Sequence, residues 1–369
     1  MRKHALPLNP ETLTAFGKEL DDLRQRTMAN VGAADARYIR RVVASVRWTG
    51  LLGRIGIYVG IFYPWALVLG ALSLGLSKII DNMELGHNVI HGQYDFMNEP
   101  SLNGQTFEWD IVGTSENWRA SHNHMHHTYT NIKGVDDDVG YGILRLFPEQ
   151  RWKPHYLLQP FYAVVFALLF QWGVAIQELR LGHLFSGRKT WSEFRQEFEP
   201  VGRKMRSQLF KDYMFFPLLA GPAFLTVVLG NLAANGIRNL WTFSIIFCGH
   251  FTKDAELFPK SILGNESRGH WYYRQIRGSS NLEGGPLLNF LSGNLSHQIE
   301  HHLFPDVPAW RYAQMAPAVR EICTRYGVHY NTGPFWRQAG QVTWRILRHA
   351  FPSQSVEREA SASAGHAAA

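Results

Sequence analysis

Apolar residues gather in four long stretches of the chain instead of being spread evenly along it. The stretches cover residues 55–80, 156–176, 213–232 and 239–251, and polar or charged segments separate them. A helix needs about 20 predominantly apolar residues to cross the core of a bilayer. The pattern therefore predicts an all-α integral membrane protein.

The first stretch is interrupted by Pro64 and carries no charged residue before Lys78. With its flanks it predicts two helices, at about 45–63 and 65–84, that turn at the sequence YPW. One bent helix is the alternative, because each of two helices would be only just long enough to cross the membrane.

Histidines occur in four groups, and their positions constrain the topology. The groups lie at 87–91, 122–127, 250 and 297–302. If they form one site they share one side of the membrane, so an even number of crossings separates the second group from the third. Three apolar stretches lie between these two groups, and one of them therefore does not cross.

The loop 179–212 indicates which stretch stays on one side. It carries eight Lys and Arg residues, whereas the predicted outer turns carry only Arg238. Basic loops favour the cytosolic side. We therefore predict that 156–176 lies in the interface and that 213–251 is a helical hairpin. The predicted fold has about four transmembrane helices in two hairpins, interfacial helices and a cytosolic helical cap.

The two ends of the chain are polar. The sequence LNPETLTAFGKELDDLRQR predicts a soluble helix that Asn9 caps, and RYIRRVVASVRW predicts a basic amphipathic helix on a membrane surface. The small, polar tail predicts disorder. The predicted organisation is an N-terminal cytosolic segment (1–44), a membrane domain (45–345) and a disordered tail (346–369).

Composition narrows the functional classes. The 369 residues are 46% hydrophobic and have a formal net charge of +7, and the mean hydropathy of −0.18 is low for a wholly embedded protein. Two cysteines, Cys248 and Cys323, exclude a disulfide framework and favour a reducing compartment. The first 50 residues lack the apolar core of a signal peptide. The basic excess favours lipid head groups or an acidic substrate over nucleic acid, since no Lys/Arg stripe with interleaved aromatics is present.

The spacing of the histidines is the strongest indication of the protein's chemistry. His87 and His91 are four residues apart, so they share one face of a helix. His122, His126 and His127 follow the pattern H-x-x-x-H-H, and His297, His301 and His302 repeat it. Adjacent residues on a helix diverge by about 100°, so each doublet can serve two neighbouring metals.

The number of ligands indicates two metals. One zinc ion takes about four ligands, and the paired histidines exceed that number before His250 is counted. Imidazole ligands without thiolate suit iron, copper or zinc. Of these, iron is the metal that activates O2 against a C–H bond.

Other polar residues have both a functional and a structural interpretation. His250 ends an apolar stretch and is a candidate ligand, whereas His124 is not needed by the repeated spacing. The sequence VDDDVG (135–140) either orients ligand imidazoles or forms a solvated turn. Glu300 is likewise either a partner of the ligands or a structural residue. The remaining histidines are interpreted as ordinary hydrogen-bonding residues; they are His4, His155, His183, His270, His329, His349 and His366.

The boxes HNVIH, HNHMHH and QIEHH, in this order within an apolar chain, resemble those of the membrane fatty acid desaturases. The stretches GHNVIHGQYDFMN, GVDDDVGYG and GNLSHQIEHHLFPDVPAWRY are similar to the actinobacterial acyl-CoA desaturase branch, which includes mycobacterial stearoyl-CoA Δ9 enzymes. The similarity extends from about residue 40 to 345.

The resemblance implies a non-haem di-iron enzyme that uses O2 and two electrons to place a cis double bond in a saturated acyl chain. The implied metal ligands are His87, His91, His122, His126, His127, His250, His301 and His302. The third box begins with Gln298, as in front-end desaturases, so direct metal contact by Gln298 is open. Internal symmetry instead favours His297. We expect Gln298 to face the metals, directly or through water, and His297 to pack beside it.

The same resemblance implies the partners and the location. No HPGG sequence marks a fused cytochrome b5 domain, so a separate NAD(P)H-dependent reductase of ferredoxin or flavin type is expected. The substrate is expected to be a fatty acyl-CoA, and charge alone nominates Arg119, Lys133, Arg188 and Lys189 for its head group. The protein is expected to be a multi-pass protein of the cell (inner or plasma) membrane, with the metal site and both termini in the cytoplasm.

Three functions follow from these features. The first is an acyl-CoA desaturase, most simply of Δ9 type. The second keeps the di-iron site but hydroxylates a lipid, or acts as a front-end (Δ6-type) desaturase. The third, more remote, is a histidine-rich membrane metal transporter, which should carry ionisable residues at mid-membrane depth.

Overall fold

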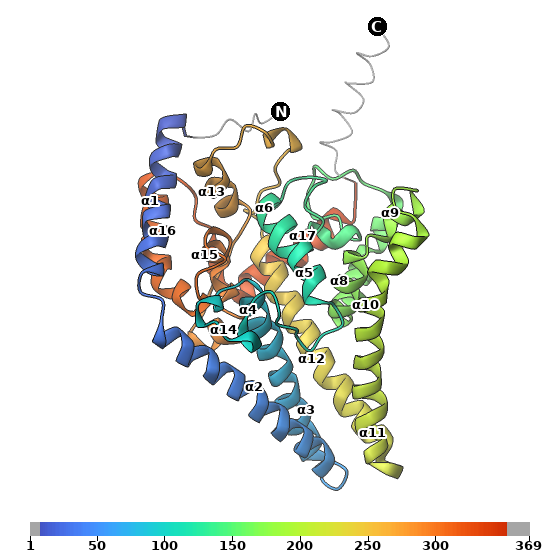
Figure 1. Cartoon of the computed structure of the whole chain (residues 1–369). Coiled ribbons are helices and arrows are strands. Elements are labelled where there is room, and N and C mark those ends of the chain that lie inside the picture. Colours follow the sequence, from blue (N-terminus) through green and yellow to red (C-terminus); the bar gives the residue numbers. More distant parts are fainter. Residues whose placement is uncertain (1–7, 353–369) are drawn as a thin grey trace.

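The structure, a computed structural model, describes residues 8–352 and is almost entirely helical (Figure 1). Its α-helices are α1 (Pro10–Met28), α2 (Ala33–Val59), α3 (Pro64–Ile79), α4 (His87–Ile90), α5 (Ser115–Trp118), α6 (His127–Tyr129), α7 (Gln159–Leu168), α8 (Phe170–Glu178), α9 (Leu181–Phe185), α10 (Trp191–Phe210), α11 (Phe216–Leu219), α12 (Phe224–His250), α13 (Arg268–Arg277), α14 (Pro286–Leu291), α15 (Gln298–Leu303), α16 (Tyr312–Arg325) and α17 (Phe335–His349). The strands β1 (Asn281–Glu283) and β2 (Thr332–Pro334) pair in parallel. The predicted disordered tail lies outside the described residues from 353 onward.

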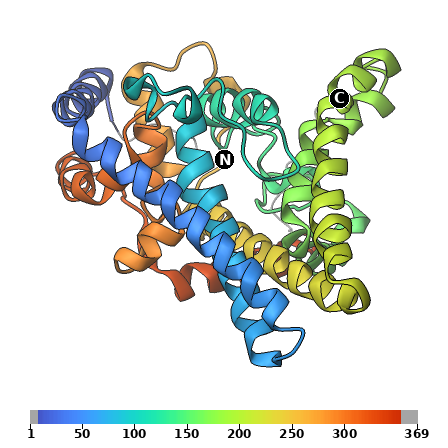
Figure 2. The same cartoon turned by 60° about the horizontal axis from the view of Figure 1, so that its bottom comes forward.

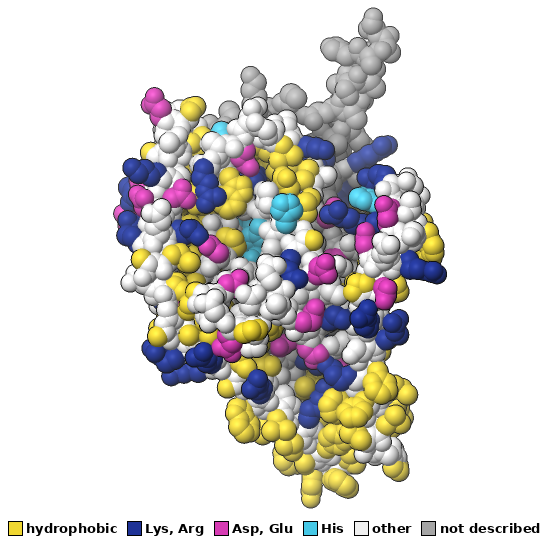
Figure 3. Space-filling view, viewed as in Figure 1, with side chains coloured by type: hydrophobic (Ala, Val, Ile, Leu, Met, Phe, Trp, Pro, Cys, Tyr) yellow, Lys and Arg dark blue, Asp and Glu magenta, His cyan; other side chains and the backbone are white. Residues whose placement is uncertain are grey.

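Two long helical hairpins form the narrow end of the molecule (Figures 1 and 2). The first consists of α2 and α3, and the second of α10 and α11 paired with α12. Helix α12 packs directly against α3 and joins the hairpins. The tips expose large apolar side chains, among them Phe62, Trp65, Leu219 and Leu225. Figure 3 shows this apolar end, whereas charged side chains cover the wider end.

Glycines bring α2 and α3 into close contact. A Cβ atom on Gly53 would lie 2.5 Å from the backbone nitrogen of Leu74, and one on Gly70 would lie 2.4 Å from that of Ile57. Only a residue without a side chain fits at these positions. Such small-residue contacts are typical of helix pairs in membranes, where close backbone packing takes the place of the hydrophobic effect.

The first hairpin turns at residues 60–63, and Pro64 is the first residue of α3, close to the predicted turn. The basic run RYIRRVVASVRW forms no separate helix, because it lies within the continuous helix α2. Helix α3 and the residues after it, Pro64–Ile90, form the one helix among the described residues that is long and apolar enough by itself to cross a membrane.

The predicted turn of the second hairpin was wrong. Helix α12 runs unbroken across residues 232–239, and the chain turns instead at 220–223, where Gly221 has a φ of 54° and Pro222 starts a new turn. Arg238 is therefore not in an outer turn but buried in mid-helix. Asn231 in the same helix donates to the carbonyl of Asp212 at 2.6 Å. Long-range hydrogen bonds thus keep polar residues inside this helix.

The stretch predicted to lie in the interface is not one straight helix. Helices α7 and α8 meet at Leu169 with a bend of 99°. Pro160 starts the first helix, and Gly173 lets the second approach it. We call this bent pair the elbow.

Helix α1 packs against helices at the wide end of the molecule, which we call the cap. As predicted, Asn9 caps α1 by accepting from the backbone N–H of Thr12 at 2.8 Å. Phe16 and Leu20 are buried in one apolar cluster with Tyr272 and Tyr312 of α13 and α16. Figure 1 shows α1 beside α16. At the other end of the chain, α17 continues beyond residue 345 to His349.

Candidate metal centre

Four segments bring the predicted histidines together at the cap end of the hairpins. Helix α3 continues through a π-helical turn (Ile80–Gly86) into α4, which carries the first box. The second box lies on a π-helix (Arg119–His126) that leads into α6. His250 is the last residue of α12, and the third box lies on α15.

The interpretation of the histidine spacing assumed regular α-helices with a step of about 100° per residue. The structure instead has π-helical turns at the first two boxes. In a π-turn the backbone bonds from residue i to i+5, which changes the direction in which side chains leave the helix. Such turns are rare and occur frequently at functional sites. The directions of His122 and His126 are therefore set by this local geometry and not by a 100° step.

The histidines form two adjacent clusters. Nitrogens of His87, His91, His122 and His301 lie within 4.8 Å of one another, and so do those of His126, His250 and His302. The ring of His127 lies between the clusters, with its centroid 4.7 Å from that of His301 and 4.4 Å from that of His302. All eight histidines proposed as ligands thus lie in one place, whereas His124 is exposed and outside it.

Many of the Nε2 atoms face one another without a suitable partner. His87 Nε2 lies 3.4 Å from His122 Nε2, and His302 Nε2 lies 3.2 Å from His250 Nε2. Among the other histidines proposed as ligands, four have an Nε2 atom that is buried without a hydrogen-bond partner in the described chain; these are His91, His126, His127 and His301. A buried unsatisfied polar atom costs about 1–3 kcal/mol. Metal ions between these nitrogens would remove that cost, so the residues fit a metal centre.

On several of the rings the protein holds the opposite nitrogen, Nδ1. His126 Nδ1 lies 3.0 Å from an Asp136 carboxylate oxygen, and His302 Nδ1 lies 2.9 Å from Gln275 Oε1. Similarly, His87 Nδ1 lies 3.2 Å from Asn88 Oδ1. An acceptor on Nδ1 fixes the proton there and leaves the Nε2 lone pair for a metal.

The segment VDDDVG (135–140) both contacts ligand imidazoles and forms part of the surface, so both interpretations given in the sequence analysis apply. Asp136 contacts His126, and Asp138 lies 3.5 Å from His122 Nδ1. Asp136 also accepts from the backbone N–H of Asn131 at 2.7 Å, which holds the loop against the second box. Asp137 points the other way and pairs with Arg180 at 3.0 Å on the surface.

The structure separates Gln298 from His297. Gln298 is buried, and its Nε2 lies 3.0 Å from His250 Nε2, while its Oε1 has no partner among the described residues. His297 belongs to neither cluster and lines a surface groove on the side of α16. Gln298 therefore faces the clusters, and His297 packs beside it.

Glu300 does not contact the clustered imidazoles. Its carboxylate accepts from Asn281 Nδ2 and from the Tyr330 hydroxyl, both at 2.8 Å. The Oδ1 of Asn281 in turn accepts from the backbone N–H of Ile299 at 2.8 Å. Glu300 thus anchors the third box to strand β1, and its role is structural.

Three further residues support the ligands and were missed in the sequence. Gln275 of α13 contacts His302 and also donates to the backbone carbonyl of His127 at 2.9 Å. The hydroxyls of Thr130 and Tyr312 lie 3.2 Å from His302 Nδ1 and 3.4 Å from His301 Nδ1. Gln275 and Tyr312 stand apart from the boxes in the sequence, so no local pattern marks them.

Burial controls the charge of the imidazoles. It lowers the pKa of His122, His127, His301 and His302 well below the ordinary value, because a charged ring loses its solvation. For His126 burial also acts to lower the pKa, but the Asp136 carboxylate outweighs it and the pKa is raised. Neutral rings present free lone pairs, and the His126–Asp136 pair is the carboxylate–histidine arrangement common at metal sites.

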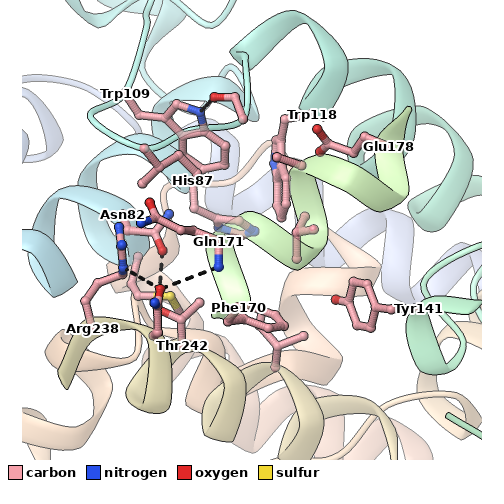
Figure 4. Close-up of a pocket in the computed structure, with 17 residues that line it drawn as sticks. Asn82, His87, Trp109, Trp118, Tyr141, Phe170, Gln171, Glu178, Arg238 and Thr242 are labelled. Carbon is pink, nitrogen blue, oxygen red and sulfur yellow. Dashed lines mark hydrogen bonds between the residues drawn. The ribbon is translucent and has the colours of Figure 1, made fainter. Parts of the chain in front are cut away.

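A narrow apolar cavity lies against the first cluster (Figure 4). His87 and Trp118 form part of its wall, and Met83, Phe170 and Ile246 are among its apolar lining. It leaves about 560 Å³ of empty space, part of it open to solvent. A long apolar ligand placed here would pass directly beside the clustered imidazoles.

This combination of histidine boxes and apolar cavity agrees with the sequence comparison. The family model described as fatty acid desaturase matches residues 63–334. The chain belongs to the fatty acid desaturase family. All three boxes, His250 and the cavity lie within the matched residues.

Several relatives in this desaturase family are similar over most of the chain. An NADPH-dependent stearoyl-CoA 9-desaturase of Mycobacterium tuberculosis is 45% identical over 93% of this chain and 80% of its own length. An sn-1 linoleoyl-lipid 6-desaturase of Synechocystis is 27% identical over 84% of this chain and 87% of its own. An acyl-lipid (7-3)-desaturase of Rebecca salina is 30% identical over 78% of this chain and 64% of its own.

Proposed function

We propose that this desaturase introduces a cis double bond at the Δ9 position of a saturated fatty acyl-CoA. The observation that carries the proposal is the pair of histidine clusters beside an apolar cavity. The 45% identity to the mycobacterial relative, named as a stearoyl-CoA 9-desaturase, supports the substrate and the position.

We propose that the clusters hold two non-haem iron ions. His87, His91, His122 and His301 would bind one ion, and His126, His250 and His302 the other, with His127 between them and Gln298 beside the second cluster. Iron at such a site, supplied with O2 and two electrons, provides the oxidising power to remove hydrogen from an unactivated C–H bond.

The remaining tasks belong to the chain itself. A mid-chain methylene has no acidic proton and no leaving group, so general acid–base residues have nothing to act on. The protein must instead hold one methylene pair close to the metals and exclude water. Trp118 contributes to both, because its ring stacks 4.2 Å from that of His122 while it also lines the cavity.

The acyl-CoA head group is proposed to bind on the cap. Of the four basic residues nominated from charge, Arg188 is exposed, and its guanidinium donates only to Ser186 Oγ among the described residues. Lys189 pairs with Glu197, and Arg119 donates to the carbonyl of Gly104 at 3.1 Å. Lys133 donates to the carbonyl of Glu149 at 2.5 Å. Arg188 is therefore the best placed of the four to meet a phosphate.

Electrons are proposed to come from a separate NAD(P)H-dependent reductase of ferredoxin or flavin type. The mycobacterial relative is named as NADPH-dependent. We further propose that the two hairpins cross the cell membrane four times, with the elbow in the interface. The metal centre and both termini would then be cytoplasmic, and residues 45–345 would form the membrane domain.

A product assay tests the proposed function. Purified protein would receive stearoyl-CoA, O2, NADPH and a reductase, and mass spectrometry would locate the double bond. A cis-Δ9 product that His301→Ala abolishes is expected. A purely hydroxylated product would instead establish the di-iron lipid hydroxylase, and a Δ6 product a front-end desaturase.

Metal analysis gives a second, independent test. Protein expressed with ample iron is expected to contain close to two iron ions per chain, in line with the two clusters. Zinc without iron would overturn the mechanism. Metal transport, the remote alternative, is disfavoured because the eight histidines lie at the cap end of the helices and not along a path across the membrane.

A further inference from the structure

A second apolar space lies on the outer side of the elbow. It is an open groove between α7, α8 and the loop at 142–143, with about 860 Å³ of empty space, part of it open to solvent. Its walls include Ile143, Phe161, Val165, Leu169, Trp172 and Ile176. We call it the elbow groove.

A single layer of aromatic rings separates the elbow groove from the cavity at the metal centre. Tyr141 and Phe170 line the cavity, whereas Phe166 lines the groove. The centroid of the Phe166 ring lies 5.2 Å from that of Tyr141 and 5.2 Å from that of Phe170. Figure 4 shows Tyr141 on the side of the cavity opposite Asn82 and Arg238, with Phe170 between them. These three rings thus stand between the two spaces.

The backbone at this layer is strained. Tyr141 has a φ of 52° and lies between Gly140 and Gly142, whose φ values are 71° and 73°. A bulky residue in the left-handed region costs about 1–3 kcal/mol, and such strain clusters at sites that move or bind ligands. The same loop carries Asp136 and Asp138, which contact the second box. Tyr141 thus lies three residues after Asp138, on the loop that contacts the second box.

The surroundings of the elbow groove indicate its occupant. Phe161, Val164 and Leu158 are 66%, 59% and 58% exposed, which is an unusual density of apolar surface for a face that meets water. The residues that line the groove include no Lys, Arg, Asp or Glu, and its titratable side chains are His155 and Tyr162. A groove of this kind, continuous with an apolar face and separated from an apolar cavity by one layer, fits a hydrocarbon chain.

We propose that the elbow groove binds the acyl chain of the acyl-CoA substrate as it arrives from the bilayer, and that Tyr141, Phe166 and Phe170 form the door through which the chain reaches the metal centre. The proposal rests on the proposed function, since it takes the substrate to be an acyl-CoA. It adds a binding site and a route to that function.

Photo-crosslinking tests the site without requiring turnover. The full chain in phospholipid nanodiscs would receive stearoyl-CoA with a diazirine near the end of its acyl chain, and mass spectrometry would locate the adducts. Adducts on Val165, Trp172 and Tyr141 that unlabelled stearoyl-CoA competes away are expected. Adducts confined to the hairpin tips, as at Phe62 or Leu225, or adducts between two protein copies, would overturn the proposal.

Two neighbouring valines give a matched kinetic test. Val165 lines the groove, whereas Val164 is exposed beside it and does not. Val165→Trp fills the groove and is expected to lower kcat/KM for stearoyl-CoA about tenfold, with unchanged iron content. Val164→Trp should leave both unchanged. Equal effects of the two substitutions, or none from either, would contradict the route. If the wild-type protein shows no desaturation, the proposed function fails, and the crosslinks still decide whether the groove binds the chain.

Discussion

At the scale of single residues, the site depends on which ring nitrogen of each histidine is occupied. Asp136, Gln275 and Asn88 each occupy an Nδ1 atom at 2.9–3.2 Å, which leaves the Nε2 atoms pointing inward. The fixed tautomer is as important as the number of imidazoles, because a ring with its proton on Nε2 cannot bind a metal through that nitrogen.

Asp136→Asn is expected to weaken iron binding at the second cluster about 10–100-fold, as loss of such a partner does at other metal sites. The amide cannot stabilise the Nδ1 proton of His126 as a carboxylate does. Iron content would be measured after dialysis against a chelator. Asp137→Asn is the control, since Asp137 pairs with Arg180 on the surface. Equal iron loss in both variants would contradict the role of Asp136.

Gln298 and His297 give a second prediction at this scale. Gln298→Ala is expected to release iron more readily, because it removes the amide beside His250. His297→Ala should retain iron, since that ring lies outside both clusters. Iron content and the electronic absorption of the loaded protein would be compared. Iron loss only in His297→Ala would reverse the assignment.

At the scale of elements, the cap is held to the first hairpin by a buried ion pair. Asp35 at the start of α2 pairs with Arg311, which precedes α16, with contacts of 2.6 and 2.8 Å. The indole N–H of Trp310 and the backbone N–H of Gly32 also donate to this carboxylate. Burial acts to raise the pKa of Asp35, but these partners outweigh it and the pKa is lowered.

Asp35→Asn is expected to destabilise the protein by about 3 kcal/mol near neutral pH, because it leaves Arg311 buried without a counter-ion. A carboxyl with a lowered folded-state pKa stabilises the protein above its unfolded-state pKa of about 3.9. This stabilisation is lost as the pH falls through the folded-state value. The difference between variant and wild type should therefore be constant from pH 5 to 8, by this linkage, and shrink below about pH 4.

Thermal unfolding in detergent, followed by tryptophan fluorescence, would measure the difference. Glu19→Gln is the control, because Glu19 pairs with Arg325 where both side chains are well exposed. Removing an exposed pair should change the stability by less than about 1 kcal/mol. A loss of stability in Asp35→Asn that does not change with pH would show that the packing of this side chain, and not its charge, holds the cap to the first hairpin.

At the scale of the whole molecule, apolar and charged surfaces are segregated. The hairpin tips are apolar, and the histidine clusters lie at the opposite ends of the same helices. This arrangement lets an acyl chain remain in an apolar environment up to the point where it reaches the metals.

Cysteine labelling would test the proposed membrane topology. Cys248 and Cys323 are both buried, so background labelling should be low. In intact cells a membrane-impermeant maleimide should label Tyr63→Cys and Leu219→Cys at the tips, but not Glu321→Cys on the cap. The cap position should become reactive after lysis. Labelling of Glu321→Cys in intact cells would contradict a cytoplasmic metal centre.

Much of the site and part of the fold were predictable from local patterns. The histidine spacing nominated seven of the eight residues that the fold brings together, since spacing within a helix restricts which side chains share a face. His250 was nominated by its place at the end of an apolar stretch, and the spacing also nominated His297, which lies outside both clusters. The start of α1 at Asn9 and the turn before Pro64 were predictable for the same reason. By contrast, the turn near Leu219 was missed, because Asn231 gains its side-chain partners Asp212 and Arg54 only from distant segments.

The sequence by itself therefore determined the donor atoms, the helical hairpins and the family. Only the tertiary structure decided that Gln275 and Asp136 hold the rings, that Glu300 does not, and that the elbow places a groove beside the cavity. The physical reason is the distance along the chain over which each kind of interaction acts. Periodicity and capping act over a few residues, whereas partners such as Gln275 and His302 meet only when segments distant in the chain pack together.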